Sequence, residues 1–246
     1  MDNWICAFHM PAFFMISGFL HKEQPLAVSF LKNVKRLLIP ALLFSLICWT
    51  YTIIVDVIKQ IPLTMDENFY KPLLGLIRYD RPNAMPQCGV IWFLEVLFIC
   101  KLVIDYVGRY RSERILVYIC IVCIALTGLI YWCNLNDKSW SFLLQRSFAS
   151  FPFVAIGYIA KRNDWLNKYC QIRWLPYVFT SLYIIGVLMN GRVGIASWRF
   201  GHSIMLYYGI ALLGCFSFFL IINKIRFRGE FAYAYFQRNN SYTLPS

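Results

Sequence analysis

Residues 6–20, CAFHMPAFFMISGFL, place a titratable imidazole inside a run of apolar side chains. His9 stands two positions before Pro11. A proline inside a helix has no N–H to donate and clashes with the carbonyl four residues earlier, here that of Ala7. Backbone groups freed in this way are tolerated within a bilayer where they pack in protein or line a wet cavity. The HMP triplet therefore indicates either the wall of an internal polar site or a kinked structural helix whose His9 ring bonds a neighbour.

Further ionisable side chains lie within apolar runs, where burial in lipid costs at least ~2.5 kcal/mol on insertion scales. Arg146, in LLQRSFASFPFVAIGYIAKR, either snorkels to the headgroups or clamps an anionic or polar group of a substrate. Lys101 and Asp105 are one helical turn apart, which predicts a structural pair on one helix face. Glu95 lies deeper in the same run and is the better candidate for chemistry.

Three cations, Lys32, Lys35 and Arg36, precede the apolar stretch LLIPALLF and stack on one face where a helix enters the membrane. Such a cluster holds the phosphates of inner-leaflet lipids. It is equally suited to the phosphates of a nucleotide-bearing donor, because charge-assisted hydrogen bonds to phosphate are strong. Both interpretations place the cluster at the cytoplasmic end of the helix.

The elements that position these residues are membrane helices. Of the 246 residues, 59% are hydrophobic and only 15% are charged, whereas about a quarter of the residues in a soluble domain are charged. The excess of Lys and Arg over Asp and Glu, 24 against 12, is gathered between apolar runs, which excludes nucleic acid as the partner and is typical of topology signals. We predict an all-α, polytopic transmembrane bundle of about seven spans. The predicted spans are residues 4–20, 37–58, 90–107, 115–133, 141–160, 174–190 and 203–222.

The odd-numbered connections between these runs are densely basic, so the positive-inside rule places them in the cytoplasm. The N-terminus is then outside and the C-terminus inside, and the proline-rich residues 59–89 form a long external loop. Most of the nine cysteines lie in apolar runs and are interpreted as small fillers. Cys120 and Cys123 lack a second pair of ligands, so we predict no metal site.

Ser17 and Gly18, in the same segment as His9, are small residues of the kind that line contacts between membrane helices. They predict the close approach of another helix to this one.

Four segments in register resemble signatures of the acyltransferase 3 family. They are FHMPAFFMISGFL, KNVKRLLIPALLFSL, VIWFLEVLFICKLV and FPFVAIGYIAKR, and the resemblance covers most of residues 5–225. It implies a bacterial inner-membrane enzyme, a fold of about ten helices, and transfer of an acyl group, commonly acetyl from acetyl-CoA, to a hydroxyl of a sugar, polysaccharide or lipid-linked glycan. The family's base is a histidine in its first span. This chain resembles the family from its second span onward, so we expect residues 1–246 to be one incomplete domain.

Esterification from a thioester requires a base for the hydroxyl proton and donors for the tetrahedral oxyanion. We expect His9 to assist as a second base, to donate to the oxyanion, or to pack against the first-span histidine of the family. Arg146 is expected to contact the oxyanion or the acceptor, and Lys32, Lys35, Arg36 and the RYRSER loop to bind acyl-CoA as co-substrate. Membrane lipid and a glycan acceptor are the expected partners. The competing hypotheses are a transporter or flippase for a glycan or polyol, which shares the broken helix and the midplane polar groups, and an inactive membrane scaffold.

Overall fold

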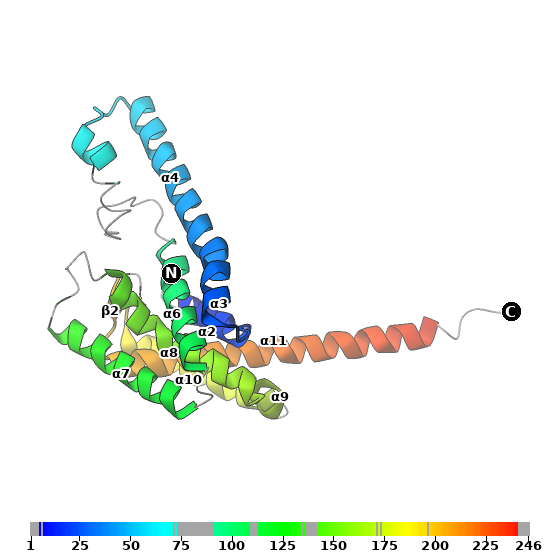
Figure 1. Cartoon of the computed structure of the whole chain (residues 1–246). Coiled ribbons are helices and arrows are strands. Elements are labelled where there is room, and N and C mark those ends of the chain that lie inside the picture. Colours follow the sequence, from blue (N-terminus) through cyan, green and yellow to red (C-terminus); the bar gives the residue numbers. More distant parts are fainter. Residues whose placement is uncertain are drawn as a thin grey trace. The chain divides into compact units, whose positions relative to one another are not determined.

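The computed structural model describes residues 5, 7–70, 72, 91–108, 113–133, 135, 142–170, 172, 174–195 and 197–240 (Figure 1). The chain divides into two compact units, which are treated separately below. Unit 1 comprises residues 1–12, 160–193 and 200–246, and unit 2 comprises residues 13–159 and 194–199. The all-helical prediction is confirmed, and the one exception among the described residues is a short hairpin. The prediction of a single domain stays a prediction.

The helices follow the apolar runs of the sequence. The first part of the chain forms α2 (His9–Phe19), α3 (Leu26–Asn33), the π-helix η1 (Val34–Leu38), α4 (Ile39–Ile58), the π-helix η2 (Asp66–Tyr70), α6 (Trp92–Gly108), α7 (Glu113–Trp132) and α8 (Phe142–Arg162). The rest forms α9 (Trp165–Cys170), α10 (Leu175–Asn190), the hairpin strands β1 (Val193–Gly194) and β2 (Arg199–Phe200), and α11 (Ile204–Asn240).

Each of the seven predicted spans coincides with a helix, but the helices differ in length. Within the described part of the chain, four segments are long and apolar enough to cross a membrane: 26–58, 113–132, 143–162 and 204–222. The other three helices, α2, α6 and α10, have 11, 17 and 16 residues. The membrane character of the bundle is therefore confirmed, while the count of seven spans stays a prediction.

One continuous 33-residue helix joins α3, η1 and α4, where the sequence had suggested a connection as far as Arg36. The π turn explains the continuity. The N–H of Ile39 donates to the carbonyl of Val34, five residues back. An ordinary turn onto Arg36 could not close at Pro40, because proline has no N–H. The wider turn therefore carries the chain past Pro40 without ending the helix.

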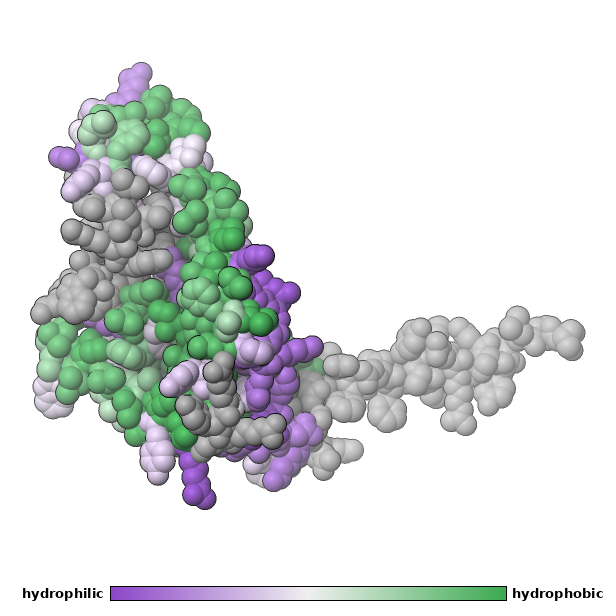
Figure 2. All heavy atoms as spheres, viewed as in Figure 1, coloured by the Kyte–Doolittle hydropathy of each residue, from purple (hydrophilic) through white to green (hydrophobic). Residues whose placement is uncertain are grey.

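A single narrow stripe of this long helix is buried. Ser29, Asn33, Leu37, Ala41 and Ser45 recur every four residues and are all buried, and α3, η1 and α4 all contact α6. Four of the five side chains are small or polar, which allows close helix packing. The remaining surface of α4 is apolar and exposed, as the green surface over α4 in Figure 2 shows. That face is suited to lipid.

Two glycines bring the backbones of α2 and α8 into direct contact. A Cβ atom built on Gly18 would lie 1.9 Å from the Val154 carbonyl oxygen, and one on Gly157 would lie 2.0 Å from the Met15 carbonyl oxygen. The contact is reciprocal, because each glycine faces the main chain of the other helix. The close approach that Gly18 predicted is confirmed, and α8 is the partner helix.

Aromatic rings fasten α6 to its neighbours in unit 2. Phe14 of α2 packs on Phe93, with ring centroids 4.7 Å apart, and Phe30 of α3 packs on Phe98 at 5.7 Å. Phe14 is completely buried. These contacts hold the helix that carries Glu95, Lys101 and Asp105 against both α2 and α3.

In unit 1, α10 and α11 pack together and are joined through the hairpin. Asn190, at the end of α10, is 1% exposed. Its Nδ2 donates to the Phe200 carbonyl at 3.0 Å, and its Oδ1 accepts from the backbone N–H groups of His202 and Ser203 at 3.0 and 3.2 Å. One side chain thus satisfies donors at the start of α11.

Cysteine usage departs from the sequence interpretation at one position. Cys48, in α4, is disulfide-bonded and is not merely a small filler. The other described thiols, those of Cys100, Cys120, Cys123, Cys133 and Cys215, are free. Only residues 59–70 and 72 of the predicted external loop 59–89 lie within the described part of the chain.

We predict that Gly18→Ala and Gly157→Ala each lower the stability of the purified protein by about 1–3 kcal/mol, because the added methyl group must push α2 and α8 apart. Thermal unfolding in detergent measures the effect. The matched control is Gly128→Ala in α7, where an added Cβ meets nothing within 4 Å. The control should leave stability unchanged or raise it by up to about 1 kcal/mol through helix propensity. Equal losses in all three variants would contradict the proposed contact.

Candidate functional site

A buried carboxylate lies at the centre of the first polar cluster of unit 2. The Nε2 of His21 donates to Asp105 Oδ1 at 2.8 Å, and the Ser29 hydroxyl donates to Asp105 Oδ2. Asn33 Nδ2 in turn donates to Ser29 Oγ at 2.9 Å. All four side chains are buried, so each hydrogen bond is made where an unpaired group would be costly. We call these four residues the Asp105 network.

The Asp105 network corrects the predicted pairing of Lys101 with Asp105. His21 and Ser29 bind the carboxylate because the segment after α2 and the start of α3 bring both donors to it across the helix contact. Lys101, one turn earlier on α6, is half-buried and interacts electrostatically with Lys32 and Arg36 as well as with Asp105.

The last turns of α8 extend this polar region. The Tyr158 hydroxyl donates to Glu23 Oε1, and the Tyr158 ring lies 6.1 Å from that of His21. Beside them, a Cβ atom on Gly108 would lie 3.7 Å from the Tyr158 oxygen. Sequence reasoning missed His21, Glu23 and Tyr158. Their positions at helix ends, next to the predicted cytoplasmic face, were the one available signal.

The basic cluster predicted from the sequence borders the Asp105 network. Lys32 is half-buried, while Lys35 and Arg36 are exposed, and all three lie on the continuous helix at or just before its π turn. Lys101 of α6 joins them, which the sequence did not indicate. Arg109 to Ser112 of the RYRSER loop lie outside the described residues. Lys101 of α6 thus lies near Lys32 and Arg36, so the structure brings cations from two helices together in unit 2.

Arg146 forms a second polar cluster, on α8. Its guanidinium carbon lies 5.1 Å from the centroid of the Trp198 ring, and Nη1 donates to Gln145 Oε1 at 3.3 Å. Gln145 itself donates to the Leu135 carbonyl at 3.0 Å. Arg146 is only 5% exposed. The side chain is therefore packed within unit 2 and does not snorkel outward, while its role as a clamp for a substrate stays a prediction.

Further polar groups lie near Arg146 in sequence or on the neighbouring helix. Ser150 is one turn further along α8 and fully buried, and its hydroxyl has no hydrogen-bond partner among the described residues. Glu95, in the first turn of α6, is also buried. The Cys100 thiol contacts the Ser147 carbonyl at 3.9 Å and ties α6 to this part of α8. The spacing of Ser150 from Arg146 on one helix face was a signal that sequence reasoning did not use.

His9 opens α2, and Pro11 lies within the first turn of that helix. A proline is tolerated there because the first N–H groups of a helix have no partner inside it. Of the alternative of a kinked structural helix, the kink is therefore wrong for the described residues, while the hydrogen bond of the His9 ring to a neighbour is present. The His9 Nδ1 lies 2.8 Å from the Ile5 carbonyl oxygen. His9 belongs to unit 1, and Arg146 and the basic cluster belong to unit 2.

A model of an acyltransferase domain matches residues 4–244, nearly the whole chain. No curated protein and no solved structure matches the chain. The family match covers α2, the basic cluster, α6 and α8 alike.

We predict that Asp105→Ala destabilises the protein by about 3 kcal/mol, because His21 and Ser29 then lose the buried hydrogen bonds that they donate to the carboxylate. Chemical unfolding in detergent measures this loss. Asp66→Ala, which removes an exposed carboxylate from η2, is the control and should cost little. A double variant, Asp105→Leu with His21→Leu, should recover part of the loss, because it leaves neither partner buried alone. A double variant no more stable than Asp105→Ala would show that the pair is not coupled.

Proposed function

Because the chain belongs to the acyltransferase 3 family, whose domain model spans residues 4–244, we propose that it transfers an acyl group from acyl-CoA to a hydroxyl of a sugar, polysaccharide or lipid-linked glycan. The protein is a membrane acyltransferase, and acetyl is the proposed acyl group. The observation that carries the proposed donor is the gathering of Lys101 with Lys32 and Arg36 beside the Asp105 network.

The basic cluster suits the phosphates of CoA. Lysine and arginine bind phosphate through charge-assisted hydrogen bonds, which are about twice as strong as neutral ones. The Asp105 network fixes the helix that carries these cations, because Ser29 and Asn33 lie one turn apart on its buried face. A cluster held in this way loses little conformational freedom when the donor binds. Lys35 and Arg36 remain exposed for contact with it.

The disulfide of Cys48 supports the proposed orientation in the membrane. Cys48 lies twelve residues beyond Arg36 on the same continuous helix, or about 18 Å at 1.5 Å per residue. Disulfides persist in oxidising compartments, whereas CoA is supplied from the reducing cytoplasm. The Arg36 end of the helix therefore faces the cytoplasm in this proposal, and the end that leads into residues 59–89 faces outward, in a bacterial inner membrane.

His9 is the proposed second base, acting in addition to the first-span histidine that the family uses. If Nδ1 donates its proton to the Ile5 carbonyl, a neutral ring carries its acceptor lone pair on Nε2. In the reaction, Nε2 takes the proton of the acceptor hydroxyl while the oxygen attacks the thioester carbonyl. The tetrahedral intermediate then expels the CoA thiolate, and the imidazolium returns the proton to that sulfur. The products are the O-acyl ester and CoA.

Arg146 is the proposed donor for the oxyanion or for acceptor hydroxyls. Its guanidinium is stacked on Trp198 and excluded from water, and a cation in a dry, prearranged site stabilises developing negative charge more strongly than it would in water. Ser150, one turn away with a buried hydroxyl, can add a second donor on the same face of α8.

We predict that Lys32→Ala and Arg36→Ala each raise the KM for acetyl-CoA by about tenfold or more, since a hydrogen bond to a charged group contributes about 1.5–3 kcal/mol. The kcat should change little. Transfer of labelled acetyl groups into glycans of membranes that carry the protein provides the assay. The control is Lys59→Ala, an exposed lysine at the opposite end of the same helix, which should leave the KM unchanged. Absence of acetyl transfer by the unaltered protein would refute the proposed enzymatic function and favour the hypothesis of an inactive membrane scaffold.

We predict that His9→Gln lowers kcat by about 10²–10⁴, the usual contribution of a positioned base, and leaves the KM for acetyl-CoA unchanged. The same labelled-acetyl assay measures both parameters. His202→Gln, at an exposed histidine just before α11, is the matched control and should retain full activity. A fully active His9→Gln variant would show that His9 takes no part in the reaction. It would not contradict the proposed binding site for acyl-CoA.

A further inference from the structure

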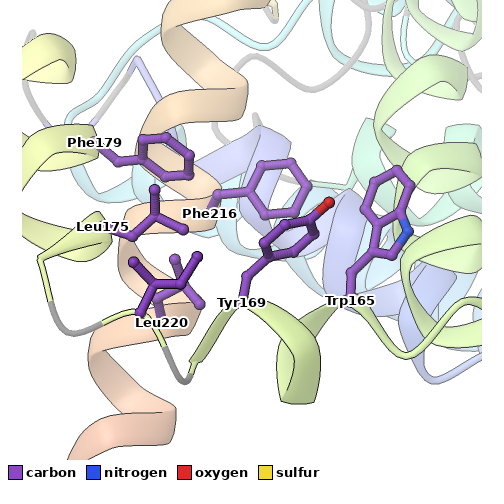
Figure 3. Close-up of a pocket in the computed structure, with 7 residues that line it drawn as sticks. Trp165, Tyr169, Leu175, Phe179, Phe216 and Leu220 are labelled. Carbon is purple, nitrogen blue, oxygen red and sulfur yellow. The ribbon is translucent and has the colours of Figure 1, made fainter.

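A cavity of about 350 Å³ lies in unit 1, among α9, α10 and α11. Figure 3 shows the labelled side chains facing one another across it, two from each helix. They are Trp165 and Tyr169 of α9, Leu175 and Phe179 of α10, and Phe216 and Leu220 of α11. The volume is at the lower end of the range for ligand-binding pockets, about 300–1,000 Å³. None of these residues belongs to the proposed acyl-transfer site.

The lining selects for hydrocarbon. Among the described lining residues, the only side-chain polar groups are the Tyr169 hydroxyl and the Trp165 indole N–H, among carbon atoms of aromatic and aliphatic residues. A sugar or a nucleotide would lose hydrogen bonds to water there and find few replacements. An alkyl chain gains free energy at about 25 cal/mol for each Å² of apolar surface removed from water. The chemistry of the cavity therefore fits part of an acyl chain.

Cations border the apolar lining. The Lys168 Nζ lies 5.9 Å from the centroid of the Tyr169 ring. Lys224 follows Leu220 by one turn of α11, and its Nζ lies 4.8 Å from the centroid of the Tyr177 ring and 3.5 Å from the Tyr177 hydroxyl. Lys161 and Arg162, the last two residues of α8, precede α9 in the sequence and are exposed, as is the acid Asp164. The rim is thus basic, where the lining is apolar.

The position of the cavity matches the edge of a membrane. The segment 161–173 that contains α9 is one of the densely basic connections, and Trp165 and Tyr169 are the residue types that gather at the interface between lipid and water. Anionic lipids give the cytoplasmic leaflet a negative surface potential, which attracts such a basic segment. An anionic phospholipid supplies both hydrocarbon and negative charge at this depth.

We infer that unit 1 holds an anionic phospholipid, with part of one acyl chain in the cavity and the phosphate at Lys168 and Lys224. This inference rests on the cavity and its rim, and it does not depend on the proposed catalysis. The acyl chain lies between α10 and α11 and beneath α9, so the lipid fastens the short interfacial helix to the two longer helices.

Photo-crosslinking of the full chain in lipid nanodiscs tests the inference. The probe is phosphatidylglycerol with a diazirine in one acyl chain, compared with phosphatidylcholine carrying the same group, and labelled peptides are identified by mass spectrometry. Labelling should concentrate on α9, α10 and α11 and should favour phosphatidylglycerol. Leu220→Trp, which fills the cavity, should reduce that labelling by about tenfold, the effect of roughly two lost buried methylene groups. Leu188→Trp, at an exposed position of α10, should not.

A charge variant keeps the test independent of any folding defect in Leu220→Trp. Lys168→Gln combined with Lys224→Gln should reduce the preference for phosphatidylglycerol by about thirtyfold, at about 1 kcal/mol for each of the two cations near the surface. Lys22→Gln, an exposed lysine of unit 2, is the control. Labelling spread evenly over the lipid-facing helices, or an unchanged preference in the double variant, would overturn the inference. Displacement of the label by palmitoyl-CoA but not by phosphatidylglycerol would also overturn it.

Discussion

The contact between α2 and α8 through Gly18 and Gly157 is the constraint on which the polar architecture of unit 2 depends. When each of two helices presents a glycine to the main chain of the other, the main chains can lie in van der Waals contact, which no larger side chain would permit. The approach brings the segment that follows α2 beside the last turns of α8. Glu23 can then accept from Tyr158, and His21 can reach Asp105 of the third helix, α6. A methyl group at either glycine would separate the helices and weaken these longer-range hydrogen bonds.

Buried charge in unit 2 is accompanied by close polar or aromatic partners. Asp105 is bound by His21 and Ser29, and Arg146 lies on Trp198 beside Gln145. In a medium of low dielectric such pairs are strong, and an unmatched charge would be destabilising by several kcal/mol. The two clusters are also chemically different. The first has a carboxylate at its centre, held by hydrogen bonds, with cations beside it. This arrangement suits a site that binds phosphates. The other offers a desolvated cation, as suits a group that stabilises negative charge.

The long helix that runs from residue 26 to residue 58 links these electrostatic features to the membrane. Its narrow stripe of small and polar residues packs on α6, and its wide apolar face is left for lipid. The π turn at Val34–Leu38 carries Lys35 and Arg36, whose side chains are exposed. Unit 1 repeats the same division on a smaller scale, with an apolar cavity beneath a basic rim. In both units, cations lie at the ends of apolar elements, because a charged group is stable where water or a phosphate can reach it.

The sequence alone determined the membrane class, the position of nearly every helix and the family, because apolar runs, basic connections and the FHMPAFFMISGFL-type segments are local patterns. It also identified Gly18 and the cations at 32, 35 and 36, since small residues and charges carry meaning wherever they fall in a span. Only the tertiary structure decided which buried polar side chains contact each other. Asp105 bonds His21, 84 residues away, and not Lys101, one turn away. Arg146 is buried on Trp198 from a distant hairpin turn. The register between helices set these partners, and that register depends on a glycine contact and on ring packing that involve several helices at once. No pattern within one segment of the sequence specifies it.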